Sequence, residues 1–376
     1  MRPLILLLAL ALTTTVAAAD DWGICKDEKV PPDESIRACT RVITAGKLSR
    51  NDLAAAYYNR AISHQQTKDA ESALADYDES IRINPKYPKA FNNRGNVWKR
   101  KGDLDRALSD FNEAIRLDPK FAMAYANRGD VWDDKGDADH AMVDLDRAIK
   151  IDPNYARAYN VRGVVWKKKG DLDRAINDFS DAIRLDPTYA VAYVNRADAL
   201  DDKGDKDSAI ADLNEALRIE PNYARAYNIR GVINRDRRDY DRAIADYSEA
   251  LRINPQMTLA WINRGNVYRD RGDQDRAVAD YNEAIRLNPK SDVAYMRRSQ
   301  ALLKKGDNIA ALRDADQAVN FDPQDAVNYA TRAAVMRALN RSDDAVADLR
   351  KGLTLRPKAN VRQEIEAALH ELGAAP

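Results

Sequence analysis

Apolar and small residues follow a helical spacing along most of the chain. In the stretch 88–121 they stand at Phe91, Gly95 and Trp98, and again at Ala107, Phe111 and Ala114. Steps of three and four residues place one apolar stripe on each of two helices. The pattern predicts a first helix over 89–100, a turn over 101–103 and a second helix over 104–117. The second helix ends before Pro119, because a proline disfavours the helical conformation of the residue before it.

The same pattern returns every 34 residues. Nine prolines mark the period: Pro85, Pro119, Pro153, Pro187, Pro221, Pro255, Pro289, Pro323 and Pro357. An aromatic residue recurs on the first helix at Tyr57, Phe91, Tyr125, Tyr159, Tyr193, Tyr227, Trp261, Tyr295 and Tyr329, with a small residue four positions later. Units of this length are typical of helical hairpins that bury their apolar faces only by stacking on one another.

The repeated motif is aromatic-x3-Gly-x2-aromatic, then Gly-Asp, then Ala-x3-Phe/Tyr-x2-Ala, then Pro. It resembles the tetratricopeptide repeat family over about residues 51–357. The resemblance implies an all-α, right-handed α-solenoid of about nine hairpins between N- and C-terminal capping helices. First helices would line a concave groove and second helices a convex back. It also implies a protein that binds peptides or partner proteins and is not an enzyme.

The two ends differ from the repeats. Residues 1–19 have the form of a cleaved signal peptide: a basic start at Arg2, a short apolar run over 4–12 and the small residues 17–19. Residues 20–50 are predicted to form an N-terminal cap with a helix over 33–45, stopped by Gly46, and residues 358–376 a C-terminal cap with a helix over 361–372. After signal cleavage the protein is expected to be periplasmic or secreted, with no membrane insertion.

The chain has two cysteines, Cys25 and Cys39, both before the first repeat. In an oxidising compartment such a pair is expected to form a disulfide. A redox pair or half of a metal site is the alternative, but neither a Cys-x-x-Cys spacing nor a nearby histidine supports it.

Each unit also carries an arginine before its small residue, where the family motif has leucine. These are Arg60, Arg94, Arg128, Arg162, Arg196, Arg230, Arg264, Arg298 and Arg332. Sixteen residues later each unit has an aspartate: Asp76, Asp110, Asp144, Asp178, Asp212, Asp246, Asp280, Asp314 and Asp348. Because the hairpin turn lies midway between them, we predict a partly buried, bidentate Arg–Asp ladder. The alternative is an anion-binding stripe.

The remaining first-helix positions are the predicted peptide-binding groove. They are Lys89, Asn92, Asn96, Lys99, Arg100, Met123, Asp130, Asp133, Asp134, Arg157, Asn160, Lys167, Lys168, Val191, Asp198, Asp201, Asp202, Arg225, Asn228, Arg235, Ile262, Asn266 and Arg269. Basic and acidic units alternate over much of this set. Either opposite charges on neighbouring helices pair with each other, or the stripes bind an extended partner of alternating charge. A carboxylate clamp at Asn92, Asn96 and Arg157 would lack the lysines that such a clamp needs.

Composition narrows the chemistry. The 376 residues hold 60 Lys+Arg and 60 Asp+Glu, so no net positive charge favours nucleic acid or an anionic membrane. The three histidines, His64, His140 and His370, are far apart in the sequence, and no phosphate loop or nucleophile motif occurs. We predict no catalytic residue, cofactor or metal. The leading hypothesis is a non-enzymatic scaffold of the bacterial envelope. The alternatives are a self-assembling component of an export or polysaccharide complex, and a metal-dependent activity; the partner and the oligomeric state stay open.

Overall fold

The protein is all-α in the part that the computed structural model describes, residues 21–375. This confirms the predicted fold class, while the predicted signal peptide, 1–19, lies outside the described residues. Tertiary contacts divide the chain between Thr188 and Tyr189 into two units. Each unit is a stack of antiparallel helical hairpins, in which consecutive hairpins contact each other.

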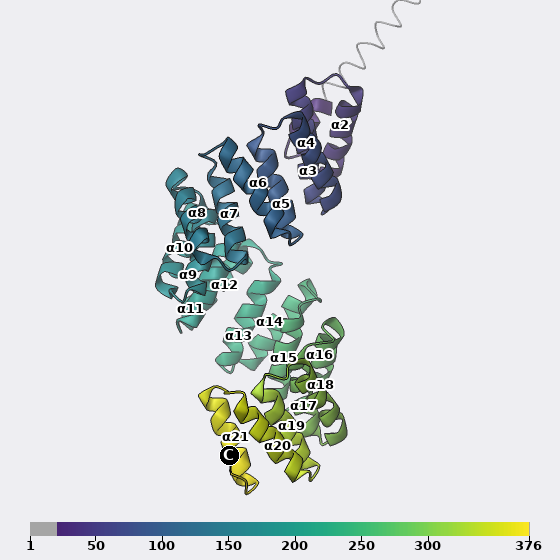
Figure 1. Ribbon diagram of the computed structural model, residues 1–376, viewed down its shortest axis with the longest axis vertical. Helices are drawn as coiled ribbons and strands as arrows, with labels where there is room; N and C mark the ends of the chain where they lie inside the picture. Colours follow the sequence, from purple (N-terminus) through teal and green to yellow (C-terminus); the bar gives the residue numbers. More distant parts are fainter. Residues whose placement is uncertain (1–20, 376) are drawn as a thin grey trace, which may run out of the picture. The chain divides into compact units, whose positions relative to one another are not determined.

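Unit 1 has, within residues 21–188, a capping helix and four hairpins (Figure 1). A helical segment, 21–26, precedes the capping helix α2 (Pro32–Ala45). The hairpins are α3 (Arg50–Gln66) with α4 (Ala70–Ile83), α5 (Pro88–Arg100) with α6 (Leu104–Leu117), α7 (Ala122–Asp134) with α8 (Ala138–Ile151), and α9 (Ala156–Lys168) with α10 (Leu172–Leu185). The helices predicted from the stretch 88–121 are therefore confirmed.

Unit 2 has, within residues 189–375, five hairpins and a last capping helix. The hairpins are α11 (Ala190–Asp202) with α12 (Lys206–Ile219), α13 (Ala224–Asp236) with α14 (Tyr240–Ile253), α15 (Thr258–Asp270) with α16 (Gln274–Leu287), α17 (Asp292–Lys305) with α18 (Asn308–Phe321), and α19 (Ala326–Ala338) with α20 (Ser342–Thr354). The capping helix is α21 (Ala359–Glu371).

The turns within the hairpins share one local geometry. In α6 the Asp103 carboxylate accepts a hydrogen bond from the Arg106 backbone N–H at 3.0 Å, which satisfies one of the amides left open at a helix start. Gly102, before it, has a φ of +82°, a conformation that glycine adopts without a steric penalty. Lys68 and Asn340 adopt the same left-handed conformation, at +63° and +59°. The turn therefore has the same left-handed conformation in hairpins that lack glycine at this position.

The helices of a hairpin cross where a small residue of the first meets the second. A Cβ atom placed on Gly163 would lie 2.6 Å from Cε1 of Phe179, so the fully buried ring leaves no space for alanine. In the hairpin of α17 and α18 the corresponding residues are Ser299 and Ala315, both fully buried. There the serine hydroxyl donates to the carbonyl of Ala311 at 2.8 Å. A smaller residue on the first helix therefore goes with a larger one at the facing position of the second helix, and the reverse, within each of these hairpins.

The capping helices cover apolar faces at the ends of the stacks. Helix α2 buries Ala38 and Val42 and stops at Gly46, whose φ is +65°. Helix α21 buries Ile365 and Leu369 against the last hairpin. Both helices agree with the capping segments predicted from the sequence to within two residues at either end.

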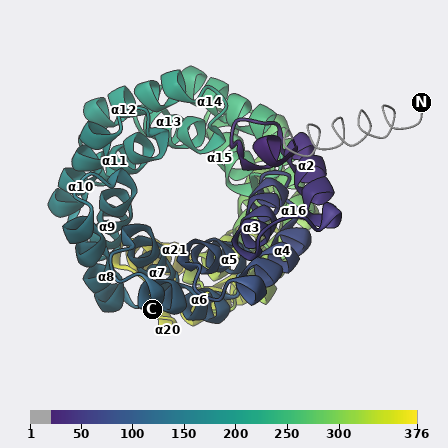
Figure 2. The ribbon, with the colours of Figure 1, turned by 90° about the horizontal axis from the view of Figure 1, so that it is seen from above.

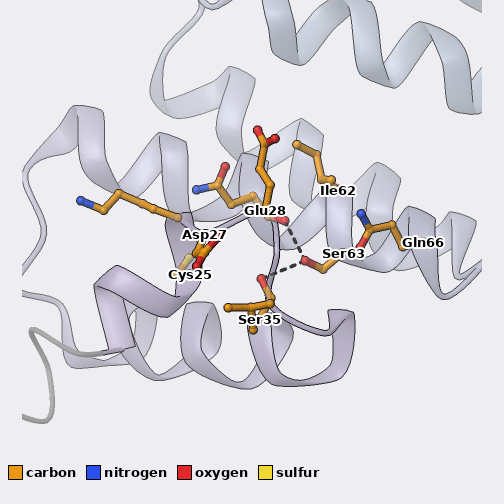
Figure 3. A pocket seen from close by; sticks show the side chains of 10 residues that line it. Cys25, Asp27, Glu28, Ser35, Ile62, Ser63 and Gln66 are labelled. Atoms are coloured by element: carbon orange, nitrogen blue, oxygen red, sulfur yellow. Dashed lines mark hydrogen bonds between the residues drawn. The ribbon is translucent and has the colours of Figure 1, made fainter.

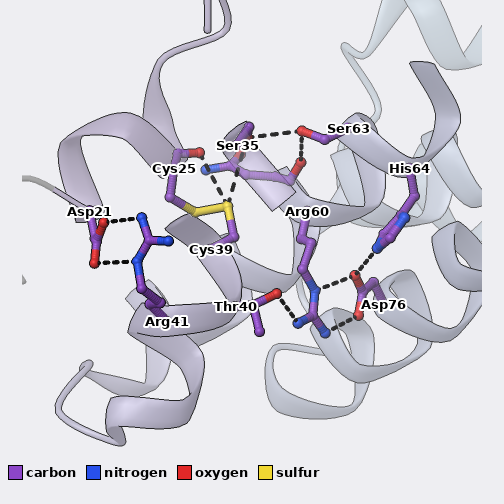
Figure 4. Close-up of a disulfide and its surroundings, with 11 residues drawn as sticks. Asp21, Cys25, Ser35, Cys39, Thr40, Arg41, Arg60, Ser63, His64 and Asp76 are labelled. Carbon is purple, nitrogen blue, oxygen red and sulfur yellow. Dashed lines mark hydrogen bonds and ion pairs between the residues drawn. A yellow bond between two sulfur atoms is a disulfide. The ribbon is translucent and has the colours of Figure 1, made fainter. Parts of the chain in front are cut away.

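The predicted disulfide is present and lies in the N-terminal cap (Figure 4). Cys25 and Cys39 are joined with their Cα atoms 4.8 Å apart, and both are buried. Arg41 of α2 donates two hydrogen bonds to the carboxylate of Asp21. Together these links hold segment 21–26 on α2.

The hairpins of each unit present their two helices on opposite faces (Figure 2). In unit 1, helices α3, α5, α7 and α9 lie on the inside of the curve and α4, α6, α8 and α10 on the outside. In unit 2, α11, α13 and α15 lie on the inside and α12, α14 and α16 on the outside. We call the face formed by the first helices of a unit its inner face.

Candidate partner-binding face

An Arg–Asp ladder links first and second helices throughout the described hairpins, as predicted. In each hairpin Nε and Nη2 of the arginine donate to the aspartate oxygens at 2.6–3.1 Å. The nine pairs are Arg60–Asp76, Arg94–Asp110, Arg128–Asp144, Arg162–Asp178, Arg196–Asp212, Arg230–Asp246, Arg264–Asp280, Arg298–Asp314 and Arg332–Asp348. All nine aspartates are buried.

The remaining guanidinium nitrogen, Nη1, bonds to the preceding hairpin in ladder arginines such as Arg94 and Arg128, and to Thr40 of the capping helix α2 in Arg60. Nη1 of Arg128 donates to Oδ1 of Asn112, on the preceding second helix, at 2.6 Å. The same guanidinium lies 5.6 Å from the ring centroid of Tyr125, within cation–π range. Hydrogen bonding to Asp178 likewise raises the pKa of Arg162. Because these donors are already used inside the protein, the ladder does not form the anion-binding stripe considered above.

A second series of ion pairs runs along the hairpin turns and was not predicted from the sequence. Lys135 Nζ lies 2.7 Å from Oδ1 of Asp105, and Arg237 Nη2 lies 2.7 Å from Oδ1 of Asp207. Lys101–Glu71, Lys169–Asp139, Arg271–Asp241 and Lys305–Asp275 repeat the arrangement. The two residues of each pair are 30 positions apart, and this spacing is the sequence pattern from which the series could have been predicted. The acidic partners are exposed, so each pair contributes only about 0–1 kcal/mol.

Opposite charges on neighbouring first helices pair with each other on the inner face of unit 1. Lys99 Nζ lies 2.6 Å from Oδ2 of Asp130 and 3.2 Å from Oδ2 of Asp134. From the next first helix, Arg157 Nη2 reaches the same Asp130 oxygen at 3.1 Å, and Lys168 lies 2.8 Å from Asp133. The alternating charges therefore neutralise one another here.

Unit 2 also has an ion pair between neighbouring first helices. Arg225 lies 3.6 Å from Asp198 and donates to Oδ1 of Asn195 at 2.9 Å. Lys206, on the second helix α12, lies 3.3 Å from Asp236 at the end of α13. Burial raises the pKa of the Asp201 carboxyl, and one of its oxygens is buried without a hydrogen-bond partner.

Four predicted groove residues are not on an open surface. Asn92, Asn160 and Ile262 are 0, 5 and 5% exposed, and Asp133 is 9% exposed. The expectation that they line an open groove is wrong, because neighbouring first helices pack directly over these positions. Oδ1 of Asn92, for example, accepts a hydrogen bond from Nδ2 of Asn127 on the next first helix at 2.8 Å. With Asn92 covered and Arg157 bound to Asp130, the considered carboxylate clamp has no open site.

The other predicted groove residues are accessible. Exposed are Lys89, Arg100, Met123, Asp134, Lys168, Asp202 and Arg225. Half-buried are Asn96, Lys99, Asp130, Arg157, Lys167, Val191, Asp198, Asp201, Asn228, Arg235, Asn266 and Arg269. Their role in partner binding stays a prediction.

Two inner-face residues of unit 2 were missed. Arg297 and Gln300 lie on α17, and Nη1 of Arg297 donates to Oε1 of Gln300 at 3.3 Å. The signal was available in the sequence: Arg297 stands where the other units have Asn, Val, Ile or Thr. It is the one charged residue at this position of the repeat.

A cavity of about 280 Å³ opens in the N-terminal cap (Figure 3). The loop with Asp27 and Glu28 forms one wall, and Ile62 and Gln66 of α3 form another. Beneath it, the Ser63 hydroxyl donates to Oγ of Ser35 at 2.9 Å. Most of its lining residues are polar or charged.

Two kinds of feature are not found in the part of the chain that the structure describes. Between residues 21 and 375, no helix combines the length and apolar character that crossing a bilayer requires. Within the same range, histidine, cysteine and acidic side chains form no cluster suited to a metal ion.

Comparison with protein families gives one consistent description. Models described as tetratricopeptide repeat match residues 54–87, 88–121, 122–155, 156–189, 194–258 and 258–291. The matches cover more than half of the chain. Comparison with curated proteins gives no match.

Two solved structures share the fold. Pseudomonas aeruginosa PilF matches 57% of this chain and 97% of its own, with 20% identity and a TM-score of 0.50. A chain in the structure of the APC/C hetero-tetramer Cut9–Hcn1 matches 96% of this chain and 89% of its own, with 15% identity and a TM-score of 0.57. At these identities the likeness concerns the fold alone.

Proposed function

Since this chain belongs to the tetratricopeptide repeat family, whose members typically mediate protein–protein interactions, we propose that it is a scaffold that holds a protein or peptide segment on its inner face. The observation that carries this proposal is the combination of chemistry on the first helices. Accessible polar and charged side chains lie there together with exposed apolar ones, Met123 at 41% and Leu259 at 66% exposure. Partner surfaces commonly combine apolar anchors with polar groups.

The partner is an extended segment rather than a small molecule. Within each unit the accessible inner-face residues repeat from one first helix to the next, so they form a row and not a single pocket. An extended chain presents side chains at regular intervals and contacts such a row along its length. The fold is typical of non-catalytic scaffolds, and no catalytic role is proposed.

The compartment is proposed to be extracytoplasmic, in the bacterial envelope. The Cys25–Cys39 disulfide supports an oxidising environment. The sequence of residues 1–19 supports export.

Site-specific photocrosslinking tests the proposed face. Four exposed apolar residues provide a matched set, with Met123 and Leu259 on first helices and Val143 and Ile309 on second helices. Each is replaced in turn by benzoylphenylalanine in the native host, and adducts are identified by mass spectrometry.

The proposal expects the same partner to be captured from Met123 and Leu259 and not from Val143 or Ile309. Capture only from the second-helix positions, or equally from all four, refutes an inner-face site. Capture of a second copy of the chain would favour the self-assembling alternative.

A further inference from the structure

Three arginines stand on neighbouring first helices of unit 2, outside the Arg–Asp ladder. They are Arg235 on α13, Arg269 on α15 and Arg297 on α17. Nη1 of Arg269 donates to Oε1 of Gln300 at 2.9 Å, and Nη1 of Arg297 donates to the same oxygen at 3.3 Å. Two guanidinium groups thus share one neutral acceptor.

The carboxylates near this cluster do not neutralise it. Arg235 and Arg269 each pair with the residue that follows them, at 2.8 Å for Asp236 and 3.0 Å for Asp270. Asp236 is also bound by Lys206 at 3.3 Å. The three arginines therefore have two paired carboxylates among them, Asp236 and Asp270.

Arg297 is the uncompensated member of the group. Among the described residues no carboxylate lies within 4.0 Å of it, and its Nε is buried without a hydrogen-bond partner. Burial and the charge of Arg269 lower the pKa of Arg297. A half-buried guanidinium with an unused donor is costly unless an anion pairs with it.

An apolar side chain lies beside the cluster on α17. Val293 is 39% exposed and precedes Arg297 by one turn of this helix. Residues four apart lie on the same side of a helix. Helix α17 therefore presents an apolar and a cationic side chain next to each other.

We propose that the inner face of α13, α15 and α17 binds an acidic segment of the protein partner, with an Asp or Glu side chain held by Arg297, beside Arg269, and an apolar side chain on Val293. Charge complementarity selects this occupant, because no carboxylate of the described residues pairs with Arg297 and a carboxylate matches a guanidinium fork. The inference rests on the proposed function and specifies the chemistry of the partner at this place.

Peptide binding tests the inference directly. The probe is a fluorescein-labelled peptide with three Leu-Glu repeats and an amidated C-terminus, compared with Leu-Gln and Leu-Lys peptides of the same length. Fluorescence anisotropy is measured with the native protein, with Arg269→Gln and Arg297→Gln variants, and with Arg286→Gln as a control. Arg286 is exposed on the second helix α16 and pairs with Glu283 at 2.8 Å, so its replacement removes the same charge from the outer face.

The expected result is preferential binding of the Leu-Glu peptide, with at least a tenfold loss of affinity in Arg269→Gln and Arg297→Gln and less than a twofold change in Arg286→Gln. Arg297→Gln is expected to melt at the native temperature or above, because it removes an uncompensated charge. If Arg297→Gln unfolds, Arg269→Gln still decides the outcome.

Several results would overturn the inference. They are failure of the native protein to bind the acidic peptide, equal binding of the Leu-Gln peptide, and native affinity in the arginine variants. Binding only when the C-terminal amide is replaced by a free carboxylate, or only when a phosphate is added to the peptide, would assign the cluster to another anion and also overturn it. Inner-face crosslinking from Met123 would still stand in each case, so the proposed function is tested separately.

Discussion

The ladder makes a quantitative prediction for the substitution Asp144→Ala. Asp144 accepts Nε and Nη2 of Arg128 at 2.7 and 2.6 Å, and its side chain is 5% exposed, while that of Arg128 is 22% exposed. The substitution leaves the guanidinium with Asn112 as its remaining hydrogen-bonded partner. The cost is therefore that of a partly buried, unpaired charge.

Removal of one partner from a buried ion pair costs about 3–5 kcal/mol. Arg128 keeps one acceptor and partial access to water, so we expect a smaller loss than that range, about 2–3 kcal/mol. For a unit of this size, that corresponds to a decrease of roughly 4–12 °C in melting temperature. The double substitution Arg128→Met/Asp144→Ala is expected to destabilise less than Asp144→Ala alone, because no unpaired charge remains.

The assay is thermal unfolding followed by circular dichroism, with hydrogen exchange to locate the effect in α7 and α8. Glu113→Ala is the matched control, since Glu113 also accepts two hydrogen bonds from one arginine, Arg116, at 2.7 and 2.6 Å. That arginine is 68% exposed, so the control is expected to change stability by less than about 1 kcal/mol. Equal melting of Asp144→Ala and Glu113→Ala would refute the assignment of the ladder as a buried pair.

Three further predictions concern local features. Gly163→Ala is expected to destabilise unit 1 by about 1–3 kcal/mol through overpacking against Phe179, with Phe179→Leu restoring part of the loss; a melt unchanged in Gly163→Ala would contradict this. The double substitution Cys25→Ser/Cys39→Ser is expected to lower the free energy of unfolding of the N-terminal cap by about 3 kcal/mol, the value for a loop this short. The loss is measured as faster hydrogen exchange in α2, and exchange at the native rate there would contradict the prediction. The capping aspartates Asp103, Asp137 and Asp273 have lowered pKa values. The largest cause is the hydrogen bond that each accepts from a backbone amide, of Arg106, His140 and Arg276 respectively, and a hydrogen bond from the same residue's side chain adds to it. Their stabilisation is complete above the unfolded pKa of about 3.9 and is lost as the pH falls below it. Replacing all three with serine should therefore flatten the melting temperature between pH 5 and pH 3, and an unchanged acid profile would count against the caps.

The repeat, its helices and the Arg–Asp ladder were predictable from the sequence because each depends on contacts within one hairpin. Arg128 and Asp144 are 16 residues apart, with the turn midway between them. Their proximity follows once two antiparallel helices are assigned. The disulfide was predictable for a similar reason, since the chain offered no other partner for either cysteine.

Exposure on the inner face was harder to predict because it depends on the offset between neighbouring first helices. Asn92 meets Asn127, 35 residues later, and Asn93 meets Tyr58 across the same interval. A residue at one position of the repeat therefore packs beside the residue that stands one position later in the next repeat. A comparison of equivalent positions does not show which residue covers it. The same offset decides which charges meet, as for Lys99 and Asp134.

The proposed inner-face site is tested most directly by hydrogen exchange of the protein alone and in complex with the partner that photocrosslinking identifies. The account predicts slower exchange in first-helix segments, above all 258–270 and 292–305 of unit 2, and little change in the second helices. Slower exchange confined to second helices, or to the capping helices α2 and α21, would contradict it.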